Sequence, residues 1–116
     1  MSYFDIMVYP ATISKKDEII DFAQRMDTIF MEYGAMRIVE TWSDDVPHGT
    51  TTDYFRAVAA GEGEAVAVGL IEWPDKATRD AGFAQMHNDE RMQGPMPFDG
   101  KRMIFGGFSP FLDLKA

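Results

Sequence analysis

Apolar residues recur with two different periods along the chain, and the change of period predicts four strands and two helices. Runs rich in β-branched and aromatic residues predict strands at 3–9, 35–43, 65–73 and 102–108. Apolar residues spaced by three and four positions predict one helix between the first two strands. A second helix is predicted from Pro74-Asp75 to about His87, because proline favours the first turn of a helix.

The boundaries of these elements follow from turn-forming and capping residues. Pro10 is expected to end the first strand, and Ser14 to cap the first helix at its N-terminus. Gly34 is well placed to end that helix in a left-handed conformation. Neither period dominates in residues 51–60, so their structure stays open, whereas a short helical turn is expected near 90–93.

The resulting order of elements, β-α-β-β-α-β, predicts an α+β fold of the ferredoxin-like type, in one domain that spans residues 1–116. Such a fold has an antiparallel sheet with two helices on one face. The third and last predicted strands are apolar on both sides, so one face of the sheet is left uncovered. We therefore expect a homodimer that packs sheet against sheet into an α/β barrel.

Composition and charge restrict the classes of partner. The 116 residues carry a net charge of −8 and no cysteine, which disfavours nucleic acids and anionic membrane surfaces and rules out thiol chemistry and disulfides. No apolar run approaches the roughly 20 residues that span a bilayer, and no signal sequence is evident. We expect a cytoplasmic protein that binds neither nucleic acid nor membrane.

The loop after the second strand gathers three candidate side chains, Asp44, Asp45 and His48. Two carboxylates and an imidazole can share a proton or hold an ion, which makes the loop a candidate binding site. The simpler explanation is a turn in which aspartates bind backbone N–H groups. The only other histidine is His87, with nothing to place it nearby, so no metal site is expected.

A second charged turn, at residues 99–102, leads into the last strand. Lys101 and Arg102 are candidates for holding the anionic group of a ligand, since arginine suits bidentate contact with a carboxylate. An ion pair with Asp44 or Asp45 explains the same residues without a ligand. We favour that structural pairing, because the chain has an excess of acidic residues.

Acidic residues within apolar strands supply the candidates for acid/base chemistry. Glu40 and Asp5 both occupy such positions, where a buried carboxyl group can acquire a raised pKa. Trp42 shares a side of its strand with Glu40 and is a candidate wall of a binding site. Six large side chains could line an aromatic cavity or form an aromatic dimer core: Tyr3, Met7, Tyr9, Trp42, Trp73 and Phe105.

Four segments carry a resemblance to a known family: Tyr3-x-Asp5, Glu40–Gly49, Trp73–Asp80 and Pro97–Phe108. With them the chain resembles the YbaA-like family of small uncharacterised bacterial proteins, in the dimeric α/β-barrel superfamily. The resemblance implies a ferredoxin-like subunit that dimerises through its sheet, and it implies no known activity. Members of the family often have cysteine where this chain has Thr41, so thiol chemistry is not essential here.

The residues and the resemblance lead to two alternative functions. The first is a homodimeric barrel that binds or converts an apolar or aromatic anionic small molecule without a cofactor. In it Glu40 or Asp5 is the acid/base group, Trp42 a wall and Arg102 the anchor. The alternative is a non-enzymatic stress or regulatory dimer whose loops bind a protein partner. Whether the protein is an enzyme is left open, since related barrels include both enzymes and ligand binders.

Overall fold

A four-stranded antiparallel sheet forms the centre of the computed structural model, which describes residues 1–116. The strands lie in the order β2-β3-β1-β4, so that the two longest strands, β1 and β3, are central. Their bounds are Tyr3–Thr12 (β1), Arg37–Trp42 (β2), Glu64–Trp73 (β3) and Ile104–Phe108 (β4). The predicted α+β class with an antiparallel sheet is confirmed.

Strand β1 continues past Pro10, which was wrongly predicted to end it. Pro10 faces Val66 in the β1–β3 ladder, and that pairing runs on to Thr12. On its other side β1 pairs with β4 only from Phe4 to Val8. Proline lacks an N–H group but is tolerated where a strand has a free edge, and β1 has one beyond the end of β4.

Helix α1 spans Lys16–Glu32 and is preceded by a 3₁₀ turn at Ile13–Lys15. Ser14 therefore lies inside that turn and is not the N-cap that the sequence predicted; Lys15 holds the cap position without a side-chain hydrogen bond. The predicted stop at Gly34 is confirmed, since this residue has a φ angle of 113°.

Helix α3 spans Lys76–Met86, and a short helix, α2, spans Tyr54–Ala57 in the stretch that the sequence left open. Both begin at an aspartate whose carboxylate accepts a backbone N–H: Asp75 from Thr78 at 2.7 Å and Asp53 from Arg56 at 2.8 Å. The expected helical turn near residue 90 is present at Glu90–Met92. None of the helices is long and apolar enough to cross a bilayer.

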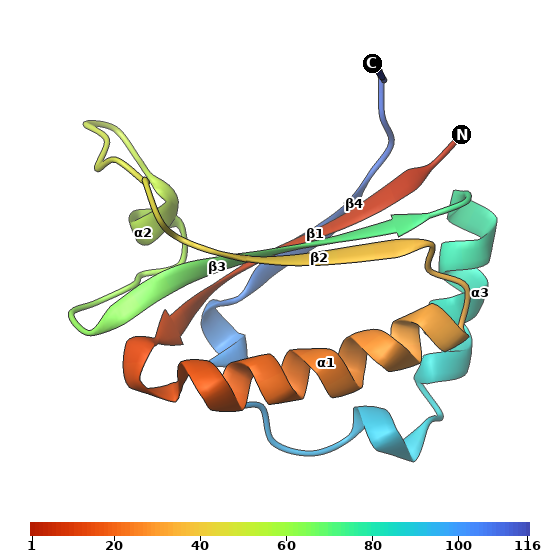
Figure 1. Ribbon diagram of the computed structural model, residues 1–116, viewed down its shortest axis with the longest axis horizontal. Helices are drawn as coiled ribbons and strands as arrows, with labels where there is room; N and C mark the ends of the chain where they lie inside the picture. The colour runs from red at the N-terminus through yellow and green to blue at the C-terminus, as the bar shows by residue number, and fades with distance from the viewer.

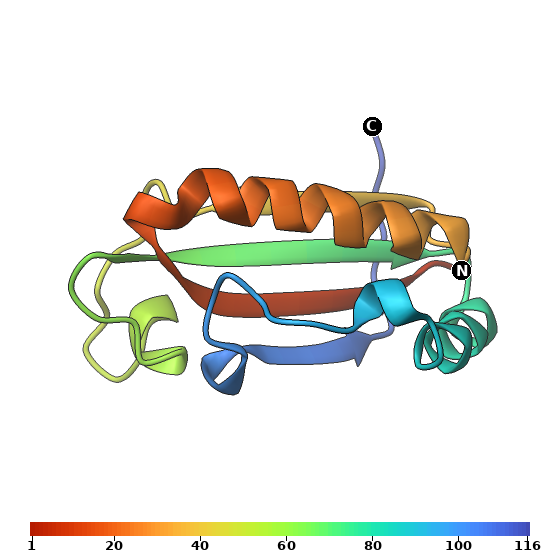
Figure 2. The ribbon, with the colours of Figure 1, turned by 90° about the horizontal axis from the view of Figure 1, so that it is seen from below.

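The two faces of the sheet have different surroundings. Helices α1 and α3 lie on one face, and α2 lies on the other near one end of the sheet (Figure 1). Seen from the helical side, α1 runs along the β2 side of the sheet, whereas the segment that joins α3 to β4 runs along β1 and β4 (Figure 2). The space between α1 and this segment is where the cavity described below is found.

Most of the buried core lies on the helical side. Trp73 is fully buried there and packs edge-on against Phe30 of α1 and Phe83 of α3. On the opposite face Val66 is 2% exposed beneath the connection that contains α2, but Leu70 and Ile104 are 36% and 48% exposed. One end of this second face is therefore covered within the chain, and the rest is an open apolar surface.

Candidate functional site

A cavity of about 310 Å³ lies between α1, the sheet and the segment that joins α3 to β4. Its walls are mostly apolar, with Phe98 and other aromatic residues among them. Five of the nine methionines of the chain line it: Met7, Met26, Met92, Met96 and Met103. A volume at the lower end of the usual range of about 300–1,000 Å³ suits a compact ligand.

Two acidic side chains, Asp27 and Glu40, meet at the wall of this cavity. Asp27 comes from α1 and Glu40 from β2, and the packing of the helix on the sheet brings their carboxyl groups within hydrogen-bonding reach. Gly69 faces Glu40 in the β2–β3 ladder and leaves room for its side chain. A Cβ atom at position 69 would lie only 2.6 Å from Glu40 Oε1.

This carboxyl pair retains a proton. Burial, followed by the hydrogen bond with Glu40 and the negative charge of Glu40, raises the pKa of Asp27 to about 8. Asp27 is half-buried and Glu40 is exposed, so Asp27 holds the proton and donates the hydrogen bond to the Glu40 carboxylate. At neutral pH Asp27 is thus mostly protonated. Neither carboxyl group forms an ion pair with a lysine, arginine or histidine.

Tyr9 of β1 adds a third polar group beside the pair. The residue is only 5% exposed and stacks on Phe98, with 4.1 Å between the ring centroids. Burial, then the acidic neighbours Glu40 and Asp27, which repel a further negative charge at the alkaline pH where tyrosine titrates, raises the pKa of Tyr9, so its hydroxyl stays protonated. No fully enclosed side-chain oxygen lacks a hydrogen-bond partner in this structure, so the Tyr9 hydroxyl, which bonds to no protein group, keeps some accessible surface. Tyr9 is one of the residues that line the cavity.

A second space of about 370 Å³ lies on the other side of the pair and shares Tyr9, Asp27 and Glu40 with the first. Trp42 and Lys16 line it, with the Lys16 ammonium group 4.9 Å from the centre of the Trp42 ring. The two spaces differ in charge, because a lysine side chain lines this one and no positively charged side chain lines the methionine-lined cavity.

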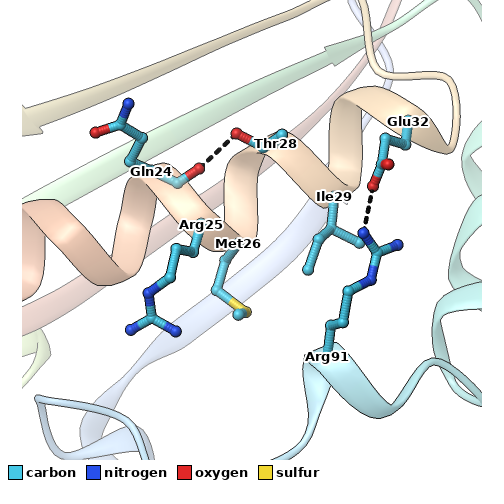
Figure 3. A pocket seen from close by; sticks show the side chains of 7 residues that line it. All are labelled: Gln24, Arg25, Met26, Thr28, Ile29, Glu32 and Arg91. Atoms are coloured by element: carbon cyan, nitrogen blue, oxygen red, sulfur yellow. Dashed lines mark hydrogen bonds and ion pairs between the residues drawn. The ribbon is translucent and has the colours of Figure 1, made fainter.

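A hollow of about 580 Å³ lies against the surface of α1 and has different properties (Figure 3). Only two of its seven lining residues are apolar. Its principal charged groups are already paired, since Arg91 donates a hydrogen bond to Glu32 at 2.8 Å across the hollow and another to Asp89. This hollow therefore has less apolar surface and fewer free polar groups with which to bind an apolar ligand than the methionine-lined cavity has.

Asp5, predicted as an acid/base candidate, is 4% exposed, and both of its oxygens are occupied. Arg79 donates to the two oxygens at 2.8 and 3.1 Å, and Trp73 Nε1 donates at 2.9 Å. This arrangement fixes α3 to the sheet and accounts for a buried carboxylate without any ligand. Asp5 does not line the methionine-lined cavity, whereas Glu40, the other predicted candidate, does.

The structure pairs Arg102 with Glu64 and Asp99, and the expected ion pair with Asp44 or Asp45 is wrong. Two parallel hydrogen bonds of 2.8 Å join the Arg102 guanidinium to the Glu64 carboxylate, and they hold the pKa of Glu64 down at about 2. With both partners supplied by the chain, the side chain is satisfied without an anionic ligand. Lys101 is exposed beside it, and its backbone N–H donates to Asp99.

The loop that carries Asp44, Asp45 and His48 lies apart from the carboxyl pair. Both aspartates are exposed, and Asp44 borders only a small hollow of about 140 Å³ next to α2. His48 stacks on Phe55 and lies 3.7 Å from Asp53, with its side chain 78% exposed. No three histidine or acidic side chains of the chain converge in a way that would hold a metal ion.

The sequence interpretation missed Asp27, Tyr9 as a polar group, and the methionines as a set. A signal for Asp27 was present, because it follows Ala23 by four positions and precedes Phe30 by three, which places it on the apolar face of the helix. The methionines gave no such signal, since they come from α1, β1 and the long segment before β4. Only the fold brings them together.

Comparison with known proteins identifies the family. Residues 2–100 match the model of a family described as "Protein of unknown function (DUF1428)". The chain belongs to this family. It is 46% identical to proteins named "Uncharacterized protein YbaA" from Escherichia coli K12 and from Shigella flexneri, over 97% of this chain and 99% of theirs. Asp27, Glu40 and Tyr9 all lie within the part that matches the DUF1428 model, whereas β4 lies beyond it.

Proposed function

We propose that this DUF1428 protein binds a small molecule in the methionine-lined cavity, with the Asp27–Glu40 pair as its proton-carrying group. One observation carries the proposal: a carboxyl pair and a tyrosine whose hydroxyl has no partner in the protein line a cavity whose other walls are mostly apolar. Ligand sites in proteins typically combine apolar walls with a few convergent polar groups. A buried carboxyl group with a pKa near neutrality is also typical of functional sites.

The pair is suited to general acid/base chemistry as well as to binding. An acid with a pKa of about 8 can donate or recover a proton near neutral pH, which is where general catalysis is most efficient. In this role Asp27 exchanges the proton, Glu40 accepts its hydrogen bond and Tyr9 orients the ligand. The proton-transferring group belongs to the protein itself, so the proposal requires no cofactor.

The proposal differs in one respect from the anionic ligand that the sequence suggested. That expectation depended on Arg102 as the anchor, and Arg102 is held by Glu64 and Asp99 and is not among the residues that line the cavity. The charged groups that do line the cavity are Asp27 and Glu40. An anionic group on the ligand is therefore not part of the proposed function.

Native mass spectrometry of the protein purified from its source organism tests the cavity. Ala23 lines both spaces beside the pair, so Ala23→Leu should fill them, whereas Ala77→Leu on the exposed surface of α3 is the matched control. We expect a co-purifying small molecule on the wild type and on Ala77→Leu, and its loss from Ala23→Leu. A wild-type protein that carries nothing, or equal retention by both variants, contradicts the proposal.

We also propose that the subunit has the ferredoxin-like fold and forms a homodimer through its open sheet face. The element order with two helices on one face and the strand order β2-β3-β1-β4 support the fold. The exposure of Leu70, Ile104 and Phe108 supports the contact. The C-terminal tail leaves β4 on the same side of the sheet (Figure 1), and its Phe111 is 99% exposed. A second copy would cover both, so we do not invoke a different protein partner.

A further inference from the structure

We propose that the methionine-lined cavity binds an organic cation, a protonated amine with a compact apolar body, whose ammonium group lies among Asp27, Glu40 and Tyr9. This inference rests on the proposed function, because it names the class of ligand for the same cavity. Two independent observations support it: a carboxyl pair without a cationic partner, and a tyrosine that is only 5% exposed and whose hydroxyl has no hydrogen-bond partner in the protein.

An ammonium group matches the hydrogen-bonding capacity of these three side chains. Carboxylates only accept hydrogen bonds, and a tyrosine hydroxyl can accept one as well, whereas an ammonium group only donates. Hydrogen bonds from a cation to a carboxylate are about twice as strong as those between neutral groups. The same site would disfavour an anion, because its only acidic or basic side chains are the two carboxyl groups and no positive side chain lines this cavity.

The walls distinguish an organic cation from an inorganic one. Calcium and magnesium need about six or more oxygen ligands, including water, whereas ten of the fourteen lining residues here are hydrophobic. Thioether sulfurs and aromatic faces instead suit the carbon skeleton of an amine, and methionines adapt their shape to it. The stacked rings of Tyr9 and Phe98 also present aromatic surface to a cation.

The surroundings of the pair also decide which side the cation occupies and how binding depends on pH. Lys16 of α1 lines the second space, and Tyr9 of β1 lines both spaces. Among the residues that line the methionine-lined cavity, the segment before β4 contributes no charged side chain and only Gln93 as a long polar one. The positive charge of Lys16 disfavours a cation in the second space. On the methionine-lined side, an ammonium group would take the place of the proton that Asp27 holds, so binding near neutral pH should release a proton.

Three probes of similar size and different charge test the ligand class: 2-phenylethylamine, 2-phenylethanol and phenylacetate. They are titrated into protein labelled with ¹³C on the methionine methyl groups, so that each of the nine methionines reports separately. We expect the amine to bind at least about tenfold more tightly than the alcohol, as befits hydrogen bonds to a charged group. The amine should shift the methyl signals of the five methionines that line the cavity. The signals of the other four should not change: Met1, Met31, Met36 and Met86.

Variants and calorimetry complete the test. Asp27→Asn and Glu40→Gln should each weaken binding of the amine by about tenfold, whereas Glu32→Gln, on the outer surface of α1, should not. Calorimetry at pH 7 in buffers of different ionisation enthalpy should detect proton release with the wild type and none with Asp27→Asn. Binding of the alcohol or of phenylacetate as tightly as the amine, at the same methionines, would overturn the cation inference and leave the cavity proposal standing. If none of the probes shifts the methyl signals of those methionines, both the cation inference and the cavity proposal are contradicted.

Discussion

Arg79 of α3 holds Asp5 of β1 with two hydrogen bonds, from Nη2 to Oδ1 at 2.8 Å and from Nε to Oδ2 at 3.1 Å. Trp73 of β3 donates a third bond to the same carboxylate, at 2.9 Å. A helix and the two central strands therefore meet at one buried anion. Because Asp5 is 4% exposed, its charge depends on Arg79 for compensation.

Arg79→Met should destabilise the protein strongly, since it removes the cation and leaves the buried carboxylate uncompensated. Loss of one partner of a buried pair typically costs about 3–5 kcal/mol. The matched control is Lys76→Met, which breaks an exposed pair with Asp80 on the same helix and should have little effect. Urea unfolding at a fixed protein concentration measures both, and similar losses in the two variants would contradict the assigned role of Asp5.

Gly69→Ala should disturb the carboxyl pair through β3. The added methyl group would lie 2.6 Å from Glu40 Oε1 and 2.9 Å from Met7 Cε, so both of these side chains must shift. Because both atoms are the ends of flexible side chains, we expect a loss at the lower end of the roughly 1–3 kcal/mol that overpacking costs. Adding Glu40→Ala should recover part of the loss, which a double-mutant cycle of unfolding free energies measures.

A control for the glycine substitution is available in the turn before β3. At Gly61 a Cβ atom would meet nothing closer than Glu64 Oε1 at 3.7 Å, which is an ordinary contact. Gly61→Ala should therefore leave stability nearly unchanged. If Gly69→Ala behaves in the same way, or if Glu40→Ala does not relieve its effect, Glu40 does not lie over Gly69 as described.

Asp27→Asn should change how stability depends on pH. The pKa of Asp27 is about 8 in the folded protein and 3.8 in its ordinary state, so between these values the folded protein binds a proton that the unfolded chain releases. Wild-type stability should fall as pH rises through this window, by at most about 1.4 kcal/mol per pH unit, and the decline should end above pH 8. Asparagine stays neutral at every pH, so the variant lacks this pH-dependent contribution. Its free energy of unfolding should therefore rise relative to that of the wild type as pH increases.

The measurement is urea unfolding of both proteins between about pH 5.5 and 8.5. Asp21→Asn serves as the control, because Asp21 is exposed on the same helix. The difference in unfolding free energy between this variant and the wild type should not grow as pH rises. Parallel pH profiles for the wild type and Asp27→Asn would show that the pair does not retain its proton.

Local patterns predicted the strands and helices because each depends on residues close in sequence. The features that they missed depend on contacts between distant segments. Pro10 is tolerated because β4 ends before it, and the length of β4 cannot be inferred from residues near Pro10. Arg102 was assigned the wrong partners for the same reason, since the approach of Glu64 is set by where β3 begins relative to the turn at residues 99–102.

The candidate site shows the same division. Glu40 was identified because a charge within an apolar strand is visible in the sequence, and the cavity does contain it. Its partner Asp27 required the helical face to be combined with the register of β2 against β3, where Gly69 makes room for the carboxylate. The proton on the pair is thus a property of tertiary packing.

The proposed dimer makes a final prediction. Leu70 lies on the open face between Ile6 of β1 and Val39 of β2, so a lysine there should oppose burial of the face against a second copy. We expect the wild type to sediment as a dimer at micromolar concentration and Leu70→Lys as a folded monomer. Met31→Lys is the control, because Met31 is similarly exposed, at 46%, but belongs to α1 on the opposite side of the sheet.

A wild-type monomer, or a dimer that survives Leu70→Lys, would contradict this contact. The same variant also separates assembly from binding. Glu40 and Asp27 lie on the helical side of the sheet, away from the open face, so the monomeric variant should bind the amine as the wild type does. Loss of binding together with loss of the dimer would show instead that the second subunit is needed to form the site.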